Sequence, residues 1–123
     1  MSKKTKTTNK TVKAVLEGIE RIKGKEILLI DLKSIQHTEC DYFVICHGTS
    51  TTQVDSIAHS VEDTVKELTG ENPWHRDGYR NSLWVLLDYG DIMVHVFQEE
   101  ARKFYNLEGL WADAKITKIE DAI

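Results

Sequence analysis

The stretch that decides the fold is SLWVLLDYGDIMVHVFQ, residues 82–98. Two apolar runs of strand length flank Asp88-Tyr89-Gly90-Asp91, a short polar connection with glycine that predicts a β-hairpin. Successive side chains of a strand point to opposite faces of a sheet, so the alternation groups on one face Trp84, Leu86, Asp88, Met93, His95 and Phe97. Because neither face is polar, we expect helices over one face and a partly exposed apolar patch on the other. The alternative is a sheet with helices over both faces.

The sequence on either side of this hairpin alternates between helical and strand patterns. Helices are predicted at residues 11–23, 49–70 and 99–105, and strands at residues 26–32, 41–48, 83–88 and 92–97, with a further short strand before Asp77-Gly78. Leu107, Leu110 and Trp111 should pack beyond the last helix. This order predicts a mixed α/β domain, with helices packed on a mixed sheet of about five strands.

The composition is that of a single globular domain. The chain has 123 residues, 41% of them hydrophobic, and one proline. We place the domain at residues 11–111, between a disordered lysine-rich tail at residues 1–10 and a polar C-terminal extension at residues 112–123. No apolar run approaches the roughly 18–20 residues of a membrane helix, and the N-terminus lacks the apolar region of a signal peptide. The expected location is the cytoplasm.

The charge is unevenly distributed along the chain. Residues 1–13 contain five lysines and no acid, although the net charge of the whole chain is −4. Of the 16 basic residues, 11 therefore remain in residues 14–123 beside all 20 acidic ones, which gives this part a net charge of −9. An acidic body binds phosphate backbones weakly, because that binding depends on cations that displace counterions. The charge favours a basic protein partner and limits RNA contact to the periphery.

The strand-to-helix junction CHGTSTTQ is the first candidate for catalysis. The backbone and hydroxyl groups of Gly48, Thr49 and Ser50 could hold a phosphate, as similar turns do in nucleotidyltransferases. That chemistry also needs two metal-binding carboxylates on the next strand, and the nearest downstream acids lie on the predicted helix. Asp88 and Asp91 lie three apart across a turn and do not share a strand face. Helix capping by Ser50 or Thr49 is therefore the favoured interpretation, and no catalytic residue is predicted.

Metal and thiol chemistry have no better support. No metal-binding motif joins the five histidines, which are His37, His47, His59, His75 and His95. Cys40 and Cys46 lack C-x-x-C spacing, and we expect both to be reduced and buried. No metal, cofactor or disulfide is predicted.

Three phrases of the sequence resemble one protein family. They are CDYFVICHGTS at residues 40–50, WVLLDYGDIMVHVF at residues 84–97 and EEARKFYNLEGLW at residues 99–111. Across residues 10–111 the chain is similar to the ribosomal silencing factors, also called Iojap-like proteins. The resemblance implies a nucleotidyltransferase-like fold without catalytic carboxylates. It also implies a non-enzymatic translational repressor that docks on the large ribosomal subunit through its fourteenth ribosomal protein and blocks joining of the small subunit when nutrients fall short.

On this resemblance the apolar face of the hairpin becomes the expected docking surface. The partner-binding role is assigned by strand facing to Trp84, Leu86, Asp88, Met93 and His95, and from the last phrase to Arg102 and Tyr105. For Tyr105 and Trp111 the alternative is that they cap the core. Two other functions stay open: a large-subunit assembly factor, as organellar family members suggest, and a nucleotide-binding enzyme that uses the Gly48 turn. A homodimer is also compatible with an apolar patch.

Overall fold

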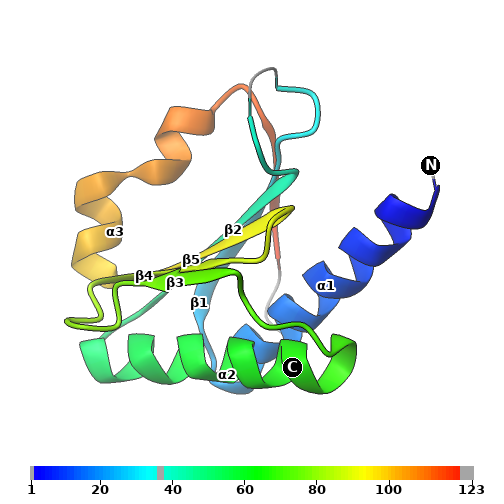
Figure 1. Ribbon diagram of the computed structural model, residues 1–123. Coiled ribbons are helices and arrows are strands. Elements are labelled where there is room, and N and C mark those ends of the chain that lie inside the picture. Colours follow the sequence, from blue (N-terminus) through cyan, green and yellow to red (C-terminus); the bar gives the residue numbers. More distant parts are fainter. Residues whose placement is uncertain (1, 36–37, 120–123) are drawn as a thin grey trace.

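A six-stranded mixed sheet forms the centre of the computed structural model, which describes residues 2–35 and 38–119. The strand order is β3-β4-β5-β2-β1-β6. The strands are β1 (Lys25–Asp31), β2 (Tyr42–Gly48), β3 (His75–Asp77), β4 (Trp84–Asp88), β5 (Ile92–Gln98) and β6 (Lys115–Lys118). The helices α1 (Ser2–Arg21) and α2 (Thr51–Thr69) lie below the sheet in Figure 1, and α3 (Glu99–Tyr105) and the 3₁₀ helix η1 (Leu107–Trp111) lie above it. The predicted mixed α/β class is confirmed, with six strands rather than about five.

The register of the β4–β5 hairpin confirms the predicted facing. The two strands are antiparallel, and the directly opposed pairs are Trp84 with Phe97, Leu86 with His95, and Asp88 with Met93. The central strands β2 and β5 are parallel. Since opposed residues of a ladder point to the same face, all six side chains lie on the side of the sheet away from α1 and α2.

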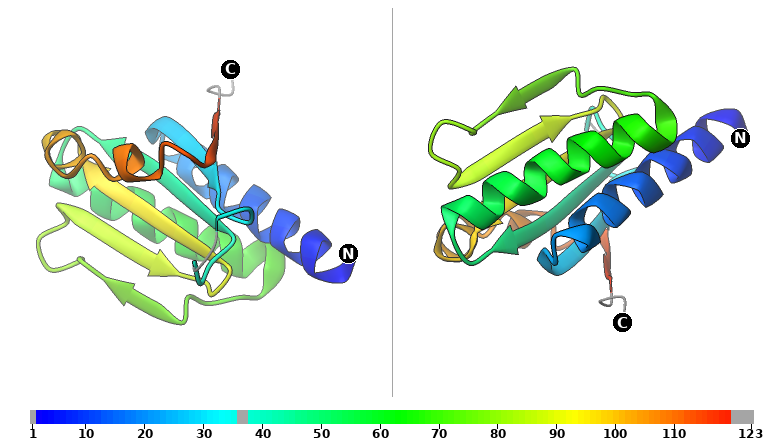
Figure 2. Two further views of the ribbon diagram at one scale, coloured as in Figure 1. Left: turned by 90° about the horizontal axis from the view of Figure 1, so that it is seen from above. Right: turned by 90° about the horizontal axis from the view of Figure 1, so that it is seen from below.

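The main core lies between the sheet and the two long helices. The fully buried strand residues of the hairpin that point into it are Val85, Leu87, Ile92, Val94 and Val96. A smaller core on the opposite face includes Phe97 and Ile45, with Leu107 and Trp111 of η1 packed against it. Leu110, also expected to pack here, is exposed. Seen from above, α3 and η1 pass over only part of the sheet and leave β3 and β4 open (Figure 2).

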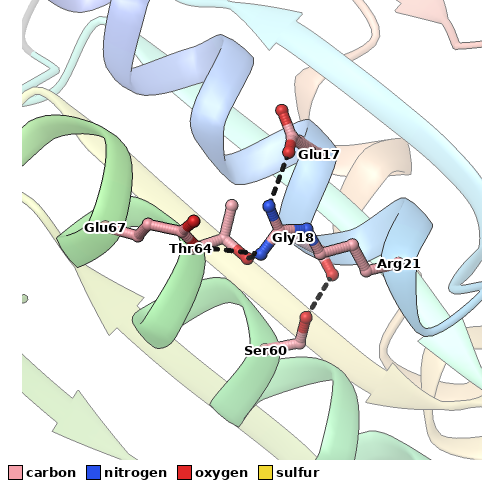
Figure 3. A network of polar contacts seen from close by, with 6 residues as sticks. All are labelled: Glu17, Gly18, Arg21, Ser60, Thr64 and Glu67. Atoms are coloured by element: carbon pink, nitrogen blue, oxygen red, sulfur yellow. Dashed lines mark hydrogen bonds and ion pairs between the residues drawn. The ribbon is translucent and has the colours of Figure 1, made fainter.

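The two long helices pack closely because of a glycine. A Cβ atom added to Gly18 of α1 would lie 2.7 Å from the Cα atom of Val61 of α2, so only glycine permits this approach. The Ser60 hydroxyl donates a hydrogen bond of 2.7 Å to the carbonyl oxygen of Gly18. Arg21 donates to the Thr64 hydroxyl at 3.0 Å and also pairs with acidic residues of both helices (Figure 3).

The ends of α2 follow the local sequence signals. The side chain of Ser50 accepts a hydrogen bond of 3.1 Å from the backbone N–H of Gln53, and this is the N-cap bond predicted for the junction. At the other end, Gly70 adopts the left-handed conformation with a φ of 81° and caps the helix.

Regular elements lie near both ends of the described chain. The helix α1 begins at Ser2, and residues 2–10 contain no glycine or proline to interrupt it. Residues 115–118, expected in a polar extension, form the edge strand β6, which pairs antiparallel with β1. Every residue of β6 is exposed. Backbone pairing therefore forms a strand that has no buried face for a sequence pattern to indicate.

Candidate functional site

The face of β4 and β5 opposite the long helices is the candidate site. Four of the side chains predicted for it are half-buried there: Trp84, Leu86, Asp88 and Met93. The carboxylate of Asp88 also accepts a hydrogen bond of 2.8 Å from the backbone N–H of Gly90, which fixes the hairpin turn. The structure thus brings these four residues together on one partly open surface, in which three are apolar.

Trp84 is the aromatic centre of this surface. Its ring stacks on the buried ring of Phe97, with centroids 4.8 Å apart, and contacts Tyr105 of α3, with centroids 4.9 Å apart. Tyr105 is 51% exposed, and its neighbour Phe104 is 81% exposed. The apolar surface therefore continues from the hairpin onto α3. The sequence prediction missed Phe104, because a single apolar residue on a short helix has no periodic signal.

His95 lies below the surface rather than on it. Its side chain is 4% exposed, although the strand alternation grouped it with the docking residues. The indole N–H of Trp84 donates to Nδ1 of His95 at 3.1 Å. Burial lowers the pKa of His95 to about 4, so the ring is neutral at physiological pH.

Arg102 is also buried, and it ties α3 to the sheet. Its guanidinium donates to the carbonyl oxygen of Glu26 at 2.8 Å, to Nδ1 of His47 at 2.9 Å and to the carboxylate of Glu108 at 3.1 Å. Burial, and then the charge of Arg102, lower the pKa of His47. The partner-contact role predicted for Arg102 therefore does not fit its position, because its donors are directed to other parts of the same chain.

Tyr105 and Trp111 were also open to a core-capping interpretation. Trp111 is half-buried and packs at a right angle to Phe43, with centroids 5.6 Å apart, as a core-capping residue does. Tyr105 covers one side of Trp84 while leaving half of its own surface exposed. The geometry is thus compatible with a surface role for Tyr105 and a core role for Trp111.

The groups considered for catalysis have structural partners. At the Gly48 turn, both the backbone N–H and the hydroxyl of Thr49 lie within hydrogen-bond distance of the side-chain oxygen of Gln53, at 2.9 and 3.2 Å. Burial raises the pKa of the Cys46 thiol to about 12 and that of Cys40 to about 11, which keeps both protonated and poorly nucleophilic. Within residues 2–35 and 38–119, no group of three or more histidine, cysteine or acidic side chains is arranged to hold a metal ion.

A polar recess of about 360 Å³ lies beside Arg102. It is lined by Glu26, His47, Glu99, Arg102, Lys103, Asn106 and Glu108.

Among the helices of residues 2–35 and 38–119, none has the length and apolar character needed to span a membrane.

Comparison with known proteins gives a consistent set of relatives. The family model described as "Ribosomal silencing factor during starvation" matches residues 5–123. The "Ribosomal silencing factor RsfS" of Bacillus subtilis is 40% identical over 98 residues, which cover 80% of this chain and 81% of the relative. The protein of the same name from Halalkalibacterium halodurans is 37% identical over 108 residues, covering 88% and 91%. The chloroplastic protein Iojap of Zea mays is 36% identical over 101 residues, covering 82% of this chain and 43% of the relative.

Solved structures show the same fold. A protein of Chromobacterium violaceum superposes with a TM-score of 0.80 at 31% identity and covers 93% of this chain and 94% of its own. A protein of Bacillus halodurans superposes with a TM-score of 0.71 at 34% identity, covering 89% and 95%.

Proposed function

Because the chain belongs to the family of ribosomal silencing factors, a ribosome-associated family of translation regulators, we propose that it blocks the joining of the two ribosomal subunits. In this proposal it binds the large subunit through the fourteenth ribosomal protein and occupies the face that the small subunit needs. The observation that supports a binding function is the partly open apolar surface around Trp84. The groups considered for catalysis, such as those of Thr49, already have hydrogen-bond partners within the protein.

Steric exclusion is sufficient for this function. Subunit joining is an equilibrium, so a protein that binds only the free large subunit removes it from the pool of intact ribosomes by mass action. No bond is made or broken, and no cofactor is needed. The extent of repression depends on the concentration of the protein relative to its dissociation constant.

The surface has features of a protein interface. Tryptophan and tyrosine are the residues that most often dominate binding energy, and here Trp84 and Tyr105 lie in contact beside the apolar side chains of Leu86 and Met93. Residues 14–123 carry a net charge of −9, which would speed the encounter with a basic ribosomal protein.

The test is substitution of Trp84 by alanine. Because the ring is half-buried at the edge of the smaller core, the fold should persist, while binding to purified large subunits should weaken at least about tenfold in a sedimentation assay. Trp74→Ala is the matched control, since that indole is 73% exposed and lies against the hairpin turn at Gly90. Loss of the circular dichroism signal in Trp84→Ala would show instead that Trp84 is a core residue.

Light scattering of mixed subunits separates the remaining functions. A silencing factor lowers the amplitude of subunit association when it is added to mature free subunits. If the protein binds large subunits but leaves the association curve unaltered, an assembly role replaces the proposal. Micromolar binding and turnover of a nucleotide with magnesium would favour the enzyme instead.

A further inference from the structure

The ring plane of Trp84 is held from two sides. Phe97, which is fully buried, stacks on the indole with an interplanar angle of 30°, and Tyr105 contacts it at 48°. These contacts restrain the plane of the ring. A half-turn about the bond that carries the ring would keep that plane but turn the N–H edge to the opposite side, so which edge faces out also depends on what the N–H meets.

The hydrogen bond to His95 makes that choice. The Trp84 indole N–H donates to Nδ1 of His95 at 3.1 Å, and His95 is buried below it. In the turned-over orientation this acceptor would lose its partner inside the protein, which is unfavourable. The observed orientation directs the only polar atom of the indole inward, so the open part of the ring consists of carbon atoms.

The rest of the His95 environment indicates that a polar residue is costly at this position. Because Nδ1 accepts a hydrogen bond, the proton of the neutral ring is on Nε2. Nε2 is buried and has no hydrogen-bond partner among the described residues, and the ring packs against Phe43 with centroids 4.6 Å apart. A phenylalanine ring at position 95 would have no ring nitrogen to leave without a hydrogen-bond partner.

We propose that His95 is a positioning residue for docking: it never touches the partner, but it orients Trp84 so that an apolar edge is presented to an apolar side chain of the partner. This inference rests on the proposed function. The inference predicts different effects on stability and on binding: an apolar residue at position 95 should preserve the fold and still impair docking.

Two substitutions of His95 test the inference. His95→Phe keeps an aromatic ring but removes the acceptor, and we expect binding to large subunits to weaken about tenfold without loss of stability. His95→Asn supplies an amide oxygen close to the position of Nδ1, and it should restore binding to within about threefold of wild type. Equal binding by wild type and His95→Phe would overturn the proposal, as would equal losses in both variants.

The indole N–H resonances provide a readout that does not need the ribosome. Three such signals are expected from Trp74, Trp84 and Trp111, and the Trp84 signal is identified by its loss in Trp84→Phe. In His95→Phe this signal should shift and exchange faster with water, and in His95→Asn it should stay protected. An unchanged Trp84 signal in His95→Phe would show that His95 does not orient the ring.

A double-mutant cycle keeps the two proposals distinguishable. If His95 acts through Trp84, His95→Phe should have no further effect on binding in a Trp84→Ala background. An additive loss would mean that His95 acts on the partner by another route and would overturn the inference. If wild type itself does not bind large subunits, the proposed function fails and the docking role fails with it, whereas the indole signal still decides whether His95 orients Trp84.

Discussion

Replacing Arg102 by methionine tests whether this residue stabilises the fold or contacts a partner. Methionine retains much of the apolar stem and removes the guanidinium of a residue that is only 6% exposed. The substitution leaves the carboxylate of Glu108 without its cation and removes a donor from both the Glu26 carbonyl and His47. The expected result is a loss of stability centred on α3.

The magnitude follows from the environment of the ion pair. Removing one partner of a buried pair costs about 3–5 kcal/mol, because the other charge stays desolvated and unpaired. The Glu108 side chain is 27% exposed, so water can partly solvate it, and we expect the lower end of this range, about 3 kcal/mol. A domain of this kind has a free energy of unfolding of about 5–15 kcal/mol, so such a loss is readily measured.

Urea unfolding followed by circular dichroism is the assay. Lys103→Met is the matched control, because it removes the same charge from the exposed neighbouring position of α3 and should change stability by less than about 0.5 kcal/mol. Adding Glu108→Leu to Arg102→Met should recover part of the loss, since no unpaired carboxylate then remains. Suppose instead that Arg102→Met lowers the free energy of unfolding by less than about 1 kcal/mol but abolishes binding to large subunits. Arg102 would then be a partner contact and not a residue that holds α3 on the sheet.

Two further predictions concern acid and helix packing. Between pH 6.5 and pH 4 the unfolded state binds a proton at His95 while the folded state does not, so stability should fall by about 3 kcal/mol through this residue as the pH drops. Urea unfolding measured across this pH range should show a smaller fall in stability for His95→Phe than for wild type. Parallel curves of stability against pH would show that His95 is not the source of the fall. Gly18→Ala should lower the unfolding free energy by about 1–3 kcal/mol despite the better helix propensity of alanine, because its Cβ would lie 2.7 Å from the Cα of Val61. The measurement is thermal unfolding, with Lys13→Ala at an exposed position of the same helix as the control. Equal unfolding midpoints for Gly18→Ala and Lys13→Ala would refute the close-packing argument.

Elements whose signals are local were predictable. The Ser50 cap and the Gly70 stop of α2 depend on a few neighbouring residues, and both occur as expected. The facing of the β4–β5 hairpin was predicted from strand alternation, and the observed register confirms it. The edge strand β6 lacked such a signal, since none of its side chains is buried and only its pairing with β1 makes it a strand.

The candidate site shows the same division between local and long-range information. Alternation along each strand, together with the short connection between them, predicted that Trp84 and His95 share a face of the sheet. Only the tertiary structure decided that Trp84 lies half-open while His95 and Arg102 are buried. Burial depends on where α3 and η1 come to lie over that face, and this placement results from contacts between residues far apart in the chain, such as Arg102 with the Glu26 carbonyl, that no local pattern encodes.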